Sequence, residues 1–300
     1  MYCAGGASQK CAPAELESSE IISLARGAAA AGCSRIRLTG GEPLERRDIA
    51  EICRGIAEIP EVSELALTTN GFRLSEYVTD LKSAGVDCIN ISLDTVNPGV
   101  FRKITGRDCL DRVLTGLDDA VSAGFRSVKI NTVLLHGLND DGHSIRELAE
   151  LACRYSVDLR FIELMPVARN DFSYRKYFSD KSAVFRALPE LMPCPEDDAG
   201  SGVAKMFRIS GASGRIGVIS PVTDKFCRSC NRIRITSDGK LRPCLLSPVE
   251  YSLRGLAVED IERKIRLCVE HKPQEHSLAP DPEQTERHGQ IRLNMQRIGG

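Results

Sequence analysis

The chain has 300 residues, 42% of them hydrophobic and 27% charged, a composition that excludes intrinsic disorder, collagen and coiled coil. The length suits one large α/β barrel, alone or with a small second domain. Forty Lys and Arg against 41 Asp and Glu give a net charge of −1, which excludes general attraction to nucleic acid, so an anionic ligand must be held by a few placed cations.

The sequence contains no apolar run of membrane-span length, and its first residues lack a basic segment followed by a hydrophobic one. We therefore expect a cytoplasmic protein that does not contact a membrane.

Between about residues 17 and 165, amphipathic helical stretches alternate with short β-branched strands. This alternation predicts a parallel sheet, either open and doubly wound or closing into a barrel. Glycines 32, 85 and 124 suit helix ends. In chain order we expect a helix at 17–31, a strand at 35–39, a helix at 48–59, a strand at 64–68, a helix at 75–84, a strand at 88–92, a helix at 110–123, a strand at 127–134, a helix at 141–155 and a strand at 158–162.

The pattern changes after Met165. Residues 166–205 are irregular, and strands are expected at 207–210 and 215–220. Further strands at 232–236 and 240–244 flank a predicted Asp238-Gly239 turn, and a helix is expected at 253–269. We predict two domains, a partial barrel at 1–205 and a C-terminal region at 206–300.

Two cations, Arg37 and Lys129, lie within predicted strands. Such side chains must face a barrel lumen or a strand end, and an isolated buried cation costs several kcal/mol. An internal salt bridge to Asp94 or Glu163 would explain either one alone. Both together, on separate strands, favour a lumen that holds an anionic ligand.

Polar segments follow the predicted strands at 39–43, 68–71, 92–94 and 163–166. Each is a common turn, but the carboxyl ends of barrel strands form one rim, where barrel enzymes keep their sites. Gly40-Gly41 lets a ligand approach the backbone, and Glu42 could hold an ammonium group.

The chain has 12 cysteines. Five of them lie in apolar patterns and are predicted core residues: Cys33, Cys53, Cys88, Cys109 and Cys153. Cys11, Cys194 and Cys268 have no partner at a useful spacing, and we expect no disulfide framework.

Cys227-x₂-Cys230-x₁₃-Cys244 has metal-ligand spacing. Structural zinc is the commoner outcome of such patterns but needs four ligands, with Cys268, His271 and His276 as distant candidates. The alternative is a three-thiolate [4Fe–4S] cluster with one open iron. Arg232 and Arg234 share a strand face beside it, which suits phosphates, although a solvated basic strand has the same pattern.

These motifs resemble those of the GTP 3′,8-cyclases, the molybdenum cofactor biosynthesis protein A family within the radical S-adenosylmethionine (SAM) superfamily. GGEP alone indicates only the superfamily, whereas the cysteine-rich motif is specific. The matching segments are RLTGGEPL (37–44), LTTNG (67–71), INISLDT (89–95), GRDCLDRVLTGLD (106–118), VKINTVLLHGLND (128–140), RFIELMP (160–166), FCRSCNRIRITSDGKLRPCL (226–245), KPQEH (272–276) and the terminal IGG.

The resemblance implies an incomplete (β/α)₆ TIM-like radical SAM barrel with a C-terminal iron–sulfur-binding extension. It implies a lyase with two [4Fe–4S] clusters. In the family, the first cluster cleaves SAM to a 5′-deoxyadenosyl radical, which abstracts the 3′ hydrogen of GTP. The product is (8S)-3′,8-cyclo-7,8-dihydroguanosine 5′-triphosphate, in the first step of molybdenum cofactor biosynthesis.

Site residues follow from the same resemblance, which assigns no catalytic acid or base. The SAM contacts would be Tyr2, Gly41, Ser92 and Met165. The GTP contacts would be Arg37, Thr68, Lys129, Arg232 and Arg234. The cluster ligands would be Cys3 for the first cluster and Cys227, Cys230 and Cys244 for the second, whose open iron would bind guanine.

The start departs from the family, whose C-x₃-C-x₂-C motif follows a first strand carrying an arginine. Met1-Tyr2-Cys3 matches only the end of that motif, and Cys11 does not restore its spacing. We therefore expect a truncated chain with an incomplete first cluster, from a mis-called start, a gene fragment or a decayed paralogue. Loss of a strand would expose a sheet edge and lower solubility.

The expected partners are GTP, SAM, an electron donor such as flavodoxin or ferredoxin, and the downstream cyclic pyranopterin monophosphate synthase. A homodimer is compatible with the resemblance, whereas nucleic acid and membrane are not expected. The alternative function is a truncated, catalytically inactive GTP-binding iron–sulfur or zinc protein. A third hypothesis is a different radical enzyme, such as a peptide-modifying relative.

Overall fold

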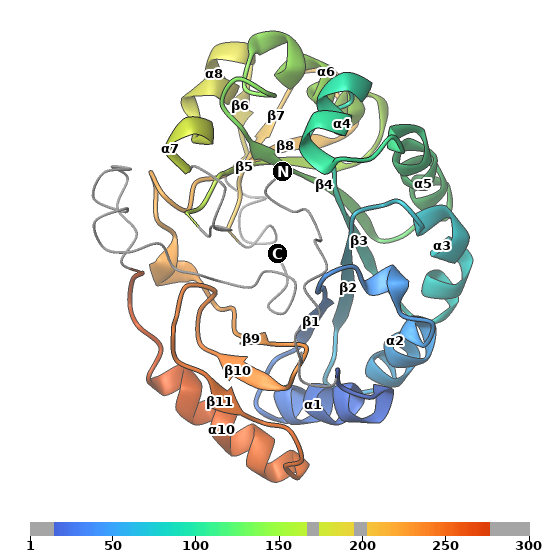
Figure 1. The fold of residues 1–300 in the computed structure, drawn as a ribbon, viewed down its shortest axis with the longest axis vertical. Helices are drawn as coiled ribbons and strands as arrows, with labels where there is room; N and C mark the ends of the chain where they lie inside the picture. The colour runs from blue at the N-terminus through green and yellow to red at the C-terminus, as the bar shows by residue number, and fades with distance from the viewer. Residues whose placement is uncertain (1–14, 167–173, 195–202, 277–300) are drawn as a thin grey trace.

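The computed structural model describes residues 15–166, 174–194 and 203–276. Its helices lie around the outside of a curved sheet (Figure 1). The strands are β1 (Arg35–Leu38), β2 (Glu64–Thr69), β3 (Cys88–Ser92), β4 (Ser127–Leu134), β5 (Asp158–Glu163), β6 (Met192–Pro193), β7 (Lys205–Arg208), β8 (Arg215–Ile219), β9 (Arg234–Ile235), β10 (Lys240–Arg242) and β11 (Tyr251–Ser252). The helices are α1 (Ser18–Ala30), α2 (Ile49–Ala57), α3 (Leu74–Ser83), α4 (Pro98–Thr105), α5 (Leu110–Ser122), α6 (Gly142–Arg154), α7 (Tyr174–Tyr177), α8 (Ser182–Ala187) and α10 (Val258–Glu270), with short 3₁₀ turns η1 (Pro43–Glu45) and η3 (Cys227–Ser229).

The large sheet has the order β1-β2-β3-β4-β5-β8-β7-β6. The strands from β1 to β8 in this order pair in parallel, and β7 and β6 extend the sheet by antiparallel pairing. Within the described residues the sheet stays open, with β1 at one edge and β6 at the other. This confirms the expected incomplete TIM-like barrel rather than a doubly wound sheet. Residues 1–14, which would bear on a missing first strand, lie outside the described part.

The two faces of the sheet differ in chemistry, as β4 illustrates. Val128, Ile130, Thr132 and Leu134 are buried beneath the helices, while the alternate residues face the lumen and are half-buried. Period-2 alternation along each strand therefore separates an apolar outer layer from a polar interior. The outer layer forms the main core with the helices.

A second core joins α1 to the C-terminal region. The outer side of α1 packs against α10, and β10 contributes Leu241. In Figure 1, α10 and the small sheet β11-β10-β9 lie beside α1. A helix was expected from residue 253, but Gly255 adopts φ 77° and Leu253 is buried in this core, so α10 begins at Val258. The left-handed backbone at Gly255 explains the shift.

The expected domain boundary at 205/206 falls at the start of β7, and β7 and β8 belong to the large sheet. The sheet is thus continuous across this position, and the division of the chain there stays a prediction. The predicted turn is confirmed, since Gly239 has φ 79° and donates its N–H to Thr236 O at 2.9 Å. Among the described helices, none is long and apolar enough to cross a membrane.

The cysteines of the described residues are free thiols. Of the predicted core cysteines, Cys53 and Cys88 are buried, and Cys33 and Cys109 are half-buried. The prediction was wrong for Cys153, which is exposed. The buried stripe of α6 runs through Ile145, Leu148, Ala149 and Ala152, and position 153 lies off it.

Candidate active site in the barrel lumen

Strand register brings polar side chains to one level of the lumen. Thr68 pairs with Asn90, Asn90 with Lys129, and Lys129 with Asp158. Because residues paired across parallel strands share a face, these four side chains line the lumen together. Arg37 lies one layer toward the amino ends of the strands, since its partner Ala66 pairs with Cys88. The layer toward the carboxyl ends is formed by Ser92, Asn131 and Arg160.

The lumen concentrates positive charge. Arg37 is exposed to the open lumen, and desolvation by the surrounding chain lowers its pKa, with the nearby charge of Arg232 as the next cause. Desolvation also lowers the pKa of the half-buried Lys129, with Arg160 as the next cause. Desolvation of the half-buried Arg234, together with the charges of Arg232 and Arg37, lowers its pKa to about 10. These cations, brought from separate strands, therefore repel one another around a common space, and an anion placed there would offset the cost.

The described residues do not show the alternative explanation, an internal salt bridge from either cation to Asp94 or Glu163. Neither Arg37 nor Lys129 forms an ion pair with a carboxylate of the residues described. Asp94 instead accepts the N–H of Val133 at 2.8 Å. Glu163 lies on the outer face and ties down loops, accepting N–H groups from Lys181 at 3.2 Å, Val222 at 3.2 Å and Thr223 at 3.0 Å.

The lumen layer that contains Thr68, Asn90, Lys129 and Asp158 lies between the other two and is called the middle layer. Two buried oxygen atoms in it have no hydrogen-bond partner among the described residues. They are Oγ1 of Thr68, whose residue is 8% exposed, and Oδ1 of Asn90, whose residue is fully buried. Leaving a buried polar atom unsatisfied costs about 1–3 kcal/mol, so such pairs indicate a ligand. A nucleotide with hydroxyl and amine groups would satisfy both.

The rim holds the second set of expected residues. Glu42 accepts hydrogen bonds from Thr69 Oγ1 at 2.7 Å, Asn70 N at 2.7 Å and Leu44 N at 3.1 Å. Burial raises the pKa of Glu42, although these bonds oppose the rise. Gly41, Ser92 and Met165 lie at or just after the carboxyl ends of β1, β3 and β5, whereas Tyr2 and Cys3 lie outside the described residues.

We call the three cysteines of the metal-ligand motif the cysteine trio. Cys227 begins η3, Cys230 directly follows it, and Cys244 comes just after β10. Cys230 donates its N–H to Cys227 O at 3.1 Å, and Leu246 N donates to Cys244 Sγ at 3.5 Å. All three thiols are half-buried. Within residues 15–166, 174–194 and 203–276, no three His, Cys, Asp or Glu side chains converge as ligands of a single metal ion. Zinc needs ligands about 2.3 Å from one point, whereas a four-iron cluster takes its thiolates on separate irons.

Two of the three distant candidates for a fourth zinc ligand are engaged elsewhere. Cys268 is 1% exposed in the core between α1 and α10. The ring Nδ1 of His271 lies 2.8 Å from Leu267 O. Cys268 is thus a core residue, and the three remaining cysteines match the donor set of a three-thiolate cluster.

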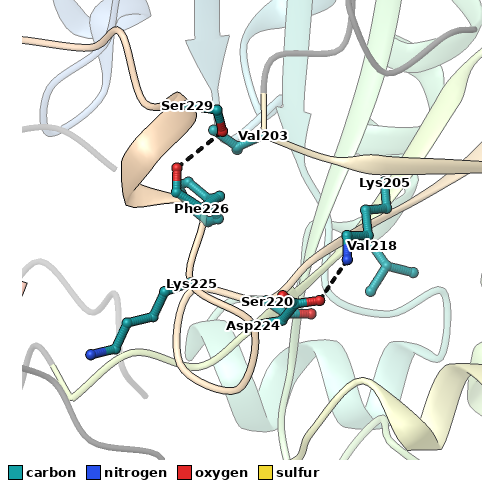
Figure 2. A pocket seen from close by; sticks show the side chains of 8 residues that line it. All are labelled: Val203, Lys205, Val218, Ser220, Asp224, Lys225, Phe226 and Ser229. Carbon is teal, nitrogen blue, oxygen red and sulfur yellow. Dashed lines mark hydrogen bonds and ion pairs between the residues drawn. The ribbon is translucent and has the colours of Figure 1, made fainter. Parts of the chain in front are cut away.

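The turn formed by η3 and Cys230 is called the cysteine turn. A cavity of about 240 Å³ lies beside it (Figure 2). Its walls come from β7, β8 and the segment leading into η3. Asp224 accepts from Lys205 Nζ at 2.7 Å and from Lys181 Nζ at 2.8 Å, and these cations lower the pKa of Asp224 to about 2. Two ammonium groups thus share one carboxylate, and with Lys225 also in the lining the cavity walls carry more positive than negative charge.

Two family models match the chain, Radical SAM superfamily over residues 1–152 and Molybdenum Cofactor Synthesis C over residues 157–278. A GTP 3′,8-cyclase of Peptoclostridium acidaminophilum is 42% identical over 90% of this chain and 81% of that protein. The GTP 3′,8-cyclase of Moorella thermoacetica is 44% identical over 79% of this chain and 73% of that protein. The chain belongs to the GTP 3′,8-cyclase family.

The cyclase-family chain shares its fold with solved radical SAM structures. Streptococcus suis SuiB bound to S-adenosylmethionine superposes with a TM-score of 0.62 over 86% of this chain and 62% of that chain, at 15% identity. The anSMEcpe structure with bound AdoMet gives 0.58 over 91% and 76%, at 13% identity. As a radical SAM enzyme, this cyclase-family member works with SAM and an iron–sulfur cluster.

The site of this cyclase-family chain includes residues that the sequence analysis missed. Arg160 is 3% exposed, and its pKa is lowered to about 10 mainly by burial, with Arg37 and Arg232 among the further causes. It lies between Leu159 and Phe161, the same cation-in-a-strand signal that singled out Arg37. Asn90 had no comparable signal, because an amide in a strand is unremarkable until its neighbours are known.

Proposed function

We propose that the chain is a GTP 3′,8-cyclase that acts in molybdenum cofactor biosynthesis. The observation that carries the proposal is the group of five cations that the chain brings to the lumen, next to the cysteine trio: Arg37, Lys129, Arg160, Arg232 and Arg234. Arg160 is buried, Arg37 is exposed and the other three are half-buried, and desolvation is the main cause that lowers the pKa of each. Asp158 lies 3.8 Å from Arg160, and a polyanion such as a triphosphate would offset the other like charges, since arginine forks match phosphate oxygens.

Residues of the middle layer of the lumen would orient the substrate. Thr68 and Asn90 offer unsatisfied oxygen atoms to the nucleoside. Arg234 begins β9 and Arg232 lies two residues before it, beside Cys230, and both would hold the phosphates at that side. Binding at several points fixes the ribose relative to the SAM site, and such positioning is a large part of catalysis.

SAM would bind at the rim, with its ammonium group on Glu42. The three donors around that carboxylate hold it in one orientation. Gly41 offers its backbone without a side chain, and Ser92 and Met165 complete the expected contacts. Tyr2 and Cys3 remain proposed contacts from the sequence alone.

We assign two [4Fe–4S] clusters, the first to the Cys3 region and the second to Cys227, Cys230 and Cys244. When bound, the first cluster supplies the electron that cleaves SAM, and the second offers an open iron to guanine. The half-buried thiols and the N–H directed at Cys244 Sγ fit such a ligand set. A flavodoxin or ferredoxin would donate the electron in the cytoplasm, and cyclic pyranopterin monophosphate synthase would consume the product.

The experiment compares GTP binding and turnover in the anaerobically reconstituted chain. We expect these 300 residues to bind GTP, and a form that carries the complete C-x₃-C-x₂-C motif to consume GTP and SAM together under reducing conditions. Arg232→Ala and Arg234→Ala should each weaken GTP binding at least tenfold, while Arg263→Ala, an exposed arginine of α10, should not. GTP binding without SAM cleavage in the form with the complete motif would favour the inactive GTP-binding protein, and GTP affinity untouched by both variants would favour a different radical enzyme.

A further inference from the structure

Lys272 reaches from the end of α10 to the cysteine turn. Its Nζ donates to Cys230 O at 2.7 Å and to Arg232 O at 2.8 Å. The same Nζ lies 3.6 Å from Cys230 Sγ. The side chain is half-buried, and its backbone N–H caps α10 by donating to Val269 O. One ammonium group thus contacts two backbone carbonyls and a thiol sulfur.

The two carbonyl groups that Lys272 contacts belong to Cys230 and Arg232, the two residues whose side chains have a proposed role in the site. They flank Asn231, so fixing both holds the short segment that presents Cys230 on one side and the guanidinium of Arg232 on the other. An ammonium has three donors, and two carbonyls leave the third directed near the sulfur. Charge-assisted hydrogen bonds are roughly twice as strong as neutral ones, so two of them from one ammonium group restrain the segment.

We propose that Lys272 is a positioning residue that couples the second cluster to the nucleotide site. The inference rests on the proposed function, because it takes Cys230 as a cluster ligand and Arg232 as a phosphate ligand. The fixed positive charge near Cys230 Sγ stabilises the more negative, reduced cluster and therefore raises its reduction potential. The clamp on Arg232 O holds the guanidinium where the nucleotide needs it.

The chain offers a matched control in Lys264. This half-buried lysine of α10 also donates to a backbone carbonyl, Ser252 O at 2.9 Å, and it makes no hydrogen bond to a cysteine of the described residues. Lys264→Met removes a lysine–carbonyl bond from the same helix. Any general effect on α10 should appear in both variants, whereas a specific effect appears only at Lys272.

Two readouts test the coupling, neither of them turnover. The midpoint potential of the second cluster, followed by EPR in the reconstituted chain, should become more negative in Lys272→Met and stay at the wild-type value in Lys264→Met. The dissociation constant for GTP, measured on metal-free protein, should rise about tenfold in Lys272→Met only. Lys272→Arg keeps the charge and should lie closer to wild type than Lys272→Met in potential.

The results separate this inference from the proposed function. If wild type holds no cluster whose signal disappears in Cys244→Ser, or does not bind GTP, the proposed function fails. If wild type does both but Lys272→Met matches Lys264→Met in either readout, the coupling is overturned. Should Lys272→Met not fold, Lys272→Gln gives the same two readouts with the same expected directions.

Discussion

Arg160 on β5 faces Gly217 on β8, and a Cβ added at position 217 would lie 3.0 Å from Cγ of Arg160. It would also lie 3.1 Å from Sδ of Met206. The missing side chain therefore leaves room for the arginine stem where it extends over the neighbouring strand. The absence of a side chain at Gly217 on β8 thus allows Arg160 on β5 to take its position.

Gly217→Val should displace Arg160 and weaken GTP binding roughly tenfold, because the larger side chain fills the space of the arginine stem. Calorimetric titration with GTP measures the effect. Urea unfolding of the same variant without GTP separates a displaced cation from a lost fold. An unchanged GTP affinity in a folded variant would show that the position of Arg160 does not matter for binding.

Asn90→Leu should leave the stability of the nucleotide-free protein about unchanged, because it removes a buried oxygen without a partner among the described residues together with the bond from Nδ2 to Leu67 O at 3.3 Å. The same change should weaken GTP binding. Thr132→Val is the control, since its hydroxyl on the outer face donates to Leu93 O at 2.6 Å. That variant should lose stability and keep its GTP affinity. Equal stability losses in both variants would argue against a ligand-directed oxygen at Asn90.

Gly27→Ala should loosen the packing of α10 on α1. An added Cβ would lie 2.4 Å from Cγ2 of Ile261, and overpacking of this kind costs about 1–3 kcal/mol. Gly142→Ala in α6 is the matched control, because its nearest neighbour is the end of Arg146 at 3.9 Å. Urea denaturation should show a loss for position 27 only, and a similar midpoint for the two variants would contradict the close contact.

Asp48 should contribute to stability in a defined pH range. Hydrogen bonds from Arg46 Nη2 at 2.7 Å and Ser18 Oγ at 2.6 Å help to lower its pKa from 3.8 to about 2, the bond from Arg46 being the largest cause. A carboxyl with a lowered folded pKa stabilises the protein above the unfolded value, and that stability is lost as pH falls from about 4 to about 2.

Asp48→Asn should therefore flatten the stability–pH curve in that window, measured by urea unfolding between pH 7 and pH 2. Arg46→Met removes the main hydrogen-bond donor and leaves the carboxyl in place, and it should flatten the curve in the same window. Parallel curves for wild type and Asp48→Asn below pH 4 would show that the carboxylate contributes nothing there.

The five strands from β1 to β5 were predictable within about one residue because of their β-branched residues and period of two, whereas the expected bounds of β7, β9 and β10 were off by up to two residues. The helix at 253–269 began too early in the prediction because Leu253 looks like part of an amphipathic stripe. In the fold it is a buried core residue, and the positive φ at Gly255 separates it from α10. The start of α10 depends on how this segment packs against α1, which the local sequence pattern does not show.

For the lumen cations, too, the sequence predicted one property and only the fold showed the other. Arg37 and Lys129 were predictable as lumen residues, since a charge between apolar strand residues has nowhere else to face. The choice between a salt bridge and a ligand was not predictable, because Asp94 and Glu163 are used by backbone N–H groups that only the fold brings near.

The sequence by itself determined the family, the parallel strand order along the chain, the lumen cations and the cysteine trio, because motif spacing and period-2 alternation are local. Only the tertiary structure decided that Arg160 joins the cations with Gly217 beside it, that Asn90 leaves an oxygen unsatisfied, and that Lys272 contacts Cys230. These relationships join residues far apart in the chain, and they arise when strands pair and α10 packs on α1.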